Sequence, residues 1–93
     1  MQKPFWVINM KTIDKKIKEL QEQLKDETRY FMYEGLNAGL KVLHQYKAGE
    51  LDVHDLTRLT QHDPRNQFSW PAQAMVSCRK EIAQFILNNV AKE

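Results

Sequence analysis

Two histidines and two aspartates lie near one another in the second half of the chain, a combination of side chains that can bind a transition metal. His54 precedes Asp55, and His62 precedes Asp63. A helical zinc pair needs histidines about three to five residues apart, whereas these two are eight apart. Arg58 would lie between them on the same helix face and repel a cation. The spacing therefore argues against a metal site, and we expect no cofactor.

The single cysteine, Cys78, is a possible nucleophile. Arg79 and Lys80 follow it, and neighbouring cations lower the pKa of a thiol. The apolar periodicity, however, places Cys78 on the buried side of a helix, where a free cysteine behaves as a small hydrophobic residue. The sequence shows no serine–histidine–aspartate order and no phosphate-binding loop. We therefore predict that the protein is not an enzyme.

Basic side chains on the first predicted helix could bind a nucleic-acid backbone. They lie on the side of this helix opposite its apolar residues, and Glu22 alone interrupts the row of basic residues. Such a ridge could follow a line of phosphates. Intrahelical pairing such as Lys15 with Glu19 makes a solvated surface the simpler interpretation. A dimeric nucleic-acid-binding protein is the alternative function, and its contact residues would be Lys11, Lys15, Lys18, Lys25 and Arg29.

Two aromatic runs suit a contact with another protein. The run PFWVIN contains Trp6, and the run RNQFSWP contains Phe68 and Trp70. Tryptophan is enriched among the residues that dominate binding energy at interfaces. Either run could instead cover a gap in the core of its own chain. Both therefore count as candidate anchors for self-association or partner binding.

Composition indicates one globular domain spanning residues 1–93. Hydrophobic residues make up 42% and charged residues 28%, which is unlike a disordered chain. The net charge of +2 is too small to indicate a nucleic-acid or membrane partner. The apolar run at residues 5–8 is too short for a signal-peptide core or a membrane span. One cysteine cannot form an intrachain disulfide, so we expect a cytoplasmic protein.

Helices must position these side chains, and the first begins near Thr12 after an extended N-terminal arm at residues 1–10. Apolar residues then recur at spacings of three and four on one stripe, which continues in phase to Tyr46. This agreement favours one helix over residues 12–47. The helix-weakening Gly35 and Gly39, and a possible cap at residues 26–28, support the alternative of a break near 26–39. Both glycines would also let another helix pack closely.

Two later helices have clearer boundaries. In GELDVHDL, Asp52 and Asp55 form a capping box, flanked by Leu51 and Leu56 as a hydrophobic staple, which predicts a helix over 53–61. Proline at residue 64 ends it. Pro71 suits a first helical turn, so the last helix is predicted over 71–90. The fold class is therefore all-α, with three main helices.

The first helix determines the expected assembly. A continuous helix of ~36 residues would be about 54 Å long, more than the two other helices can cover. Its apolar stripe would need a second chain, so we expect dimerisation to complete the helical bundle. The sequence thus predicts a non-catalytic protein-binding or regulatory module that binds itself and another protein. Besides Trp6, Phe68 and Trp70, the contact residues would be Ile13, Ile17, Leu20, Leu24 and Phe31.

Overall fold

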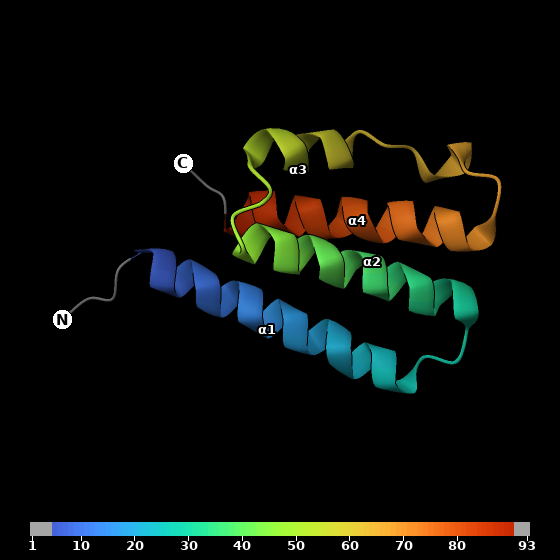
Figure 1. The fold of residues 1–93 in the computed structure, drawn as a ribbon, viewed down its shortest axis with the longest axis horizontal. Coiled ribbons are helices and arrows are strands. Elements are labelled where there is room, and N and C mark those ends of the chain that lie inside the picture. The colour runs from blue at the N-terminus through green and yellow to red at the C-terminus, as the bar shows by residue number, and fades with distance from the viewer. Residues whose placement is uncertain (1–4, 91–93) are drawn as a thin grey trace.

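The computed structural model describes the backbone of residues 5–90 and the side chains of residues 11–90 (Figure 1). This part of the chain is all-helical, which confirms the predicted fold class. In chain order it contains α1 (Phe5–Asp26), α2 (Tyr30–Lys47), α3 (Val53–Thr60), the short 3₁₀-helix η1 (Pro64–Asn66) and α4 (Trp70–Asn89). Helices α2 and α4 run side by side in the same direction, and α1 and α3 flank them in the opposite direction (Figure 1).

The chain is not helical at residues 27–29, so the continuous helix favoured over 12–47 is wrong. Arg29 has an extended backbone (φ −82°, ψ 120°). Its backbone N–H donates to Glu27 Oε1 at 3.0 Å, and its guanidinium Nε–H donates to the same oxygen at 3.0 Å. The Glu27 side chain thus satisfies groups outside the helical pattern, and α2 folds back along α1. The alternative of a break near 26–39 is correct, although Gly35 and Gly39 both lie inside α2.

Helix α1 begins earlier than the sequence predicted. Its first residue is Phe5 rather than Thr12, so residues 5–10 continue the helix instead of forming an extended arm. Residues 1–4 and the side chains of residues 1–10 lie outside the part of the chain that the structure describes. The rest of the arm prediction concerns these residues. The early start lengthens the helix that packs along α2.

Two glycines allow α2 to pack closely on α4. A Cβ atom added to Gly35 would lie 3.0 Å from the Ala74 carbonyl oxygen and 3.1 Å from Cys78 Sγ. One added to Gly39 would lie 3.1 Å from Ile82 Cγ1. All three distances are shorter than ordinary van der Waals contact, so an alanine at either position would press on α4. The predicted close helix packing at these glycines is confirmed.

All four α-helices contribute to one core. The largest fully buried side chains are Ile13, Leu43, Leu56 and Ile86, one from each helix in chain order. They belong to a single cluster of buried apolar residues. Among the described helices, none combines the length and apolar character that a bilayer crossing requires.

The capping box of α3 forms as predicted. The Asp55 N–H donates to Asp52 Oδ1 at 2.9 Å, and the Asp52 N–H donates to Asp55 Oδ2 at 3.1 Å. Leu56 is fully buried, and Leu51 packs against the same core. The helix ends at Thr60, one residue before the predicted end. Helix α4 also starts within one residue of the prediction, where the Ser69 hydroxyl accepts the Ala72 N–H at 3.2 Å.

Because of this capping box, the free energy of unfolding should fall as the pH becomes acidic. The hydrogen bond from the Asp55 N–H lowers the pKa of Asp52 below its ordinary value. A lowered folded-state pKa adds stability that is present above the unfolded pKa of about 4 and is lost as pH falls through the folded pKa. We expect Asp52→Asn, which keeps a cap acceptor but cannot titrate, to show a shallower loss of stability below pH ~4. Urea midpoints of both proteins between neutral and acid pH measure this, and parallel curves would contradict it.

Candidate functional site

The structure places most of the apolar stripe of α1, which was expected to contact a second chain, inside the chain's own core. Ile13, Ile17 and Leu20 are 0%, 8% and 6% exposed, and Leu24 packs partly buried against the same cluster. The reversal at residues 27–29 brings α2 and α4 onto the stripe of α1, so its own chain provides the cover expected from a partner. Ile13, Ile17 and Leu20 are therefore covered within one chain, whereas Leu24 stays partly exposed. The Trp6 side chain falls outside the described residues.

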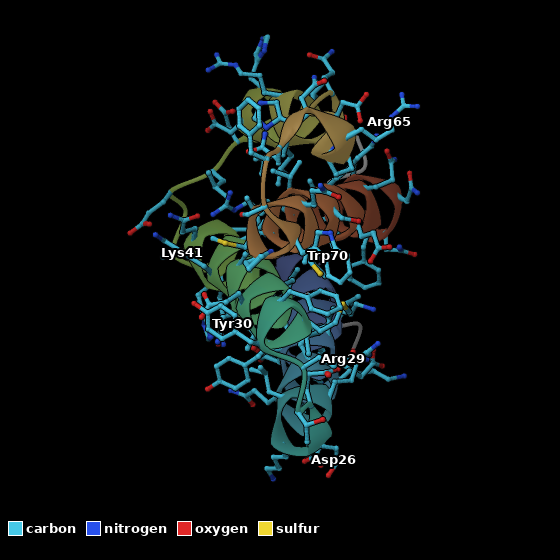
Figure 2. All side chains as sticks on the ribbon, turned by 90° about the vertical axis from the view of Figure 1, so that its right-hand side faces the viewer. Asp26, Arg29, Tyr30, Lys41, Arg65 and Trp70 are labelled. Atoms are coloured by element: carbon cyan, nitrogen blue, oxygen red, sulfur yellow. The ribbon has the colours of Figure 1, made fainter. Side chains whose placement is uncertain are left out.

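Two other predicted contact residues, Phe31 and Trp70, meet at one end of the bundle, where Figure 2 labels Trp70 and Tyr30. Helices α2 and α4 both start at this end, and the Phe31 and Trp70 rings meet edge to face with their centroids 5.6 Å apart. Phe68 and Trp70 are highly exposed, and Tyr30 at the start of α2 is 69% exposed. We call Tyr30, Phe31, Phe68 and Trp70 the aromatic surface.

A hollow of about 430 Å³ adjoins the aromatic surface. It lies between α2, η1 and α4, and Phe31, Met32, Trp70 and Ala74 supply apolar parts of its lining. Pro64 begins η1, which packs against α4 and supplies Pro64 and Arg65 to one side of the hollow. This end of the molecule therefore has both protruding aromatic rings and a recess of similar chemistry.

The arginines beside the aromatic surface already have acidic partners. Arg29 pairs with Glu27 at 3.0 Å, and Arg65 pairs with Asp63 at 2.9 Å. Hydrogen bonds from these guanidinium groups are the largest cause of the lowered pKa values of Glu27 and Asp63. Because each charge is compensated locally, this end of the bundle suits an apolar partner better than a phosphate backbone.

The predicted basic ridge is only partly continuous. Lys11, Lys15, Lys18 and Lys25 are exposed on α1, but Arg29 lies beyond the end of the helix. Lys25 pairs with Glu22 at 3.4 Å, and Arg29 is bound to Glu27. The break at residues 27–29 thus shortens the ridge, because Arg29 lies in the connection between α1 and α2.

The possible catalytic and metal-binding residues remain dispersed. His54 and His62 are exposed near opposite ends of α3, and no group of three His, Cys, Asp or Glu side chains in the described part of the chain is arranged to hold a metal ion. Cys78 is half-buried between α2 and α4. Burial, followed by the charge of Glu81, raises the pKa of its thiol, opposite to the effect expected from adjacent basic residues.

Sequence reasoning did not identify Tyr30 as a contact residue. Inside a continuous helix it would lie on the polar side, opposite the two apolar faces. Its exposure follows from the face of α2 that it occupies, which it shares with the exposed Asn37 and Lys41. In the sequence, the indication for Tyr30 was its position close to the possible helix cap at residues 26–28.

Comparisons of the chain with protein-family models, curated proteins and solved structures found no match.

Proposed function

We propose that the protein is a non-catalytic protein-binding or regulatory module that acts through the aromatic surface. The observation that carries the proposal is the exposure of Phe68 and Trp70, which reaches 106% and 70%. Fully burying one large apolar side chain contributes roughly 1.5–3 kcal/mol. Aromatic residues are also enriched in the buried centres of protein interfaces. A partner that covers these rings would gain this energy.

A second copy of the chain is the partner that the surface fits best. The aromatic surface has a protruding anchor, Phe68, and a recess lined by Phe31 and Met32. A two-fold arrangement needs both on one surface, because each copy must present the anchor and receive it. The proposed homodimer therefore meets at the end of the bundle and not along Ile13, Ile17, Leu20 and Leu24.

The test is the replacement of the most exposed anchor. We expect Phe68→Ser to weaken self-association about tenfold or more, since truncating a central aromatic residue commonly costs over 1 kcal/mol. Sedimentation equilibrium over a range of concentrations measures the dissociation constant. Val53→Ser is the matched control, because Val53 is also exposed (47%) but lies at the start of α3, at the opposite end of the bundle. This control should self-associate like the wild type.

Two results would contradict the proposed dimer. A wild-type mass of 11.0 kDa at every concentration would exclude it. Equal weakening by Phe68→Ser and Val53→Ser would remove the aromatic surface from the interface. Binding of duplex DNA or RNA at low salt that disappears in Lys15→Gln/Lys18→Gln would favour the alternative function instead.

A further inference from the structure

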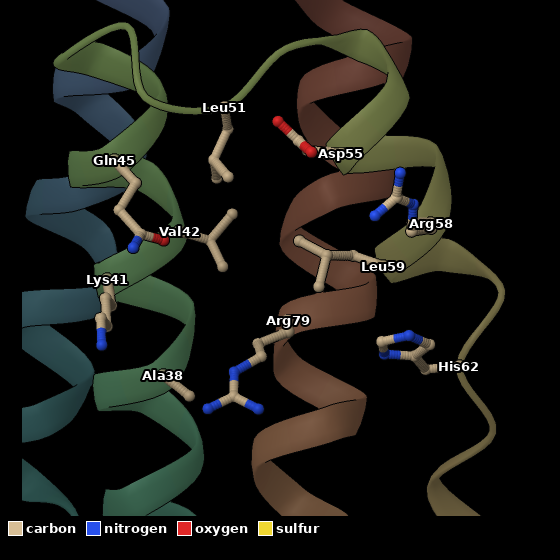
Figure 3. A pocket seen from close by; sticks show the side chains of 10 residues that line it. All are labelled: Ala38, Lys41, Val42, Gln45, Leu51, Asp55, Arg58, Leu59, His62 and Arg79. Atoms are coloured by element: carbon tan, nitrogen blue, oxygen red, sulfur yellow. The ribbon is translucent and has the colours of Figure 1, made fainter.

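A second cavity, of about 390 Å³, lies in the groove between α2, α3 and α4 (Figure 3). Its size is typical of a pocket for a small molecule. Ala38, Val42, Leu51 and Leu59 form an apolar floor. It shares no lining residue with the hollow beside the aromatic surface. The two sites can therefore be tested separately.

The rim of this groove is rich in basic groups. Lys41 comes from α2, Arg58 from α3 and Arg79 from α4, and His62 follows the end of α3. Within residues 11–90, no carboxylate forms an ion pair with Lys41, Arg58 or Arg79. Among the described lining residues Asp55 alone is acidic, and its carboxylate also accepts the Asp52 N–H. One carboxylate faces the lysine and two arginines, so helices from three parts of the chain bring an excess of positive charge to one cavity.

The arrangement of these side chains gives the groove two different ends. Figure 3 shows Leu51 and Asp55 at one end, while the Arg79 guanidinium lies at the other, between Ala38 and His62. An anionic group would avoid Asp55 and approach Arg79, whose planar guanidinium can donate two parallel hydrogen bonds to a carboxylate or phosphate. Val42 and Leu59 lie between the two ends and offer apolar contact.

We propose that this groove binds a small organic anion. Its carboxylate or phosphate lies beside Arg79, within reach of Lys41, and its apolar body rests on Val42 and Leu59. Packing within the chain accounts for neither part of the groove, because within residues 11–90 the lysine and the two arginines form no ion pair and the apolar floor is left open. A ligand that combines charge with an apolar body matches both.

Phenyl phosphate is the probe, and ¹H–¹⁵N NMR titration is the measurement. We expect shifts at the backbone amides of Val42 and Leu59 and at the Arg79 side-chain N–H. Arg79→Gln should weaken binding about tenfold or more, as expected for losing a charge-assisted hydrogen bond. Lys41 is exposed, so Lys41→Gln should fold like the wild type and weaken binding several-fold. Lys18→Gln on the exposed face of α1 is the matched charge control and should bind like the wild type.

Further probes separate the two parts of the ligand. Inorganic phosphate and benzyl alcohol should each bind about tenfold or more weakly than phenyl phosphate, since each lacks one part. Benzoate distinguishes a carboxylate from a phosphate as the preferred group, and tight binding of either supports the proposal. Absence of shifts in the groove up to roughly 10 mM phenyl phosphate would overturn it. Equal weakening by Arg79→Gln and Lys18→Gln, or equal affinity for inorganic phosphate, would also overturn it.

Discussion

Shortening Ile13 to alanine is expected to lower the free energy of unfolding by about 2–5 kcal/mol. Ile13 is fully buried, and the removed atoms would leave a cavity beneath α2 and α4. A chain of this size is stabilised by only roughly 5–14 kcal/mol in total. The variant should therefore lose a large fraction of its stability. Urea denaturation followed by circular dichroism measures the loss.

Leu24→Ala is the control, because Leu24 belongs to the same stripe but is only partly buried. In the observed fold its truncation should cost clearly less than that of Ile13. If the stripe packed against a second chain instead, truncating Ile13 or Leu24 would cost a similar amount of stability, and either substitution would dissociate a dimer. Equal losses of stability, accompanied by a fall in mass in sedimentation, would contradict the intrachain packing of α1.

Replacing Gly35 with valine is expected to destabilise the fold by about 3 kcal/mol. The first added carbon would already lie 3.0 Å from the Ala74 carbonyl oxygen, which belongs to the backbone of α4. A backbone atom inside a helix cannot move aside without displacing the helix. The substitution should therefore force α2 and α4 apart, and urea denaturation should show a lower midpoint with a cooperative transition.

The matched comparison uses alanine at both glycines. Gly35→Ala and Gly39→Ala each gain about 1 kcal/mol of helix propensity, so the difference between them isolates packing. At Gly39 the nearest atom is Ile82 Cγ1, at 3.1 Å, on a side chain that can adjust. We expect Gly39→Ala to be the more stable variant by roughly 1–2 kcal/mol. Equal stability would show that α4 yields as easily at Ala74 as at Ile82.

Short-range signals in the sequence were sufficient for the second half of the fold. The cap at Asp52, the staple of Leu51 with Leu56, and Pro71 in a first turn depend on residues a few positions apart, and α3 and α4 begin within one residue of their predicted starts. The close packing at Gly35 was predictable for a similar reason. A residue without a side chain inside an apolar helix indicates that another backbone is near.

Apolar periodicity did not reveal where the first long helix ends, because the apolar stripe of α1 continues in phase into α2. The competing signal was a local bond between Glu27 and Arg29, which a pattern of apolar residues does not register. Once the chain reverses there, the same stripe changes from an expected interchain seam into the inside of one bundle.

The sequence by itself therefore determined that the chain is helical, where its later helices begin and which faces are apolar. Only the tertiary structure decided what covers those faces and which distant side chains meet. Phe31 contacts Trp70, and Lys41 shares a groove with Arg58 and Arg79, because α2 and α4 run in the same direction while α3 lies beside α4. The physical reason is that helical spacing fixes direction around one axis, whereas a binding surface depends on how several axes are arranged.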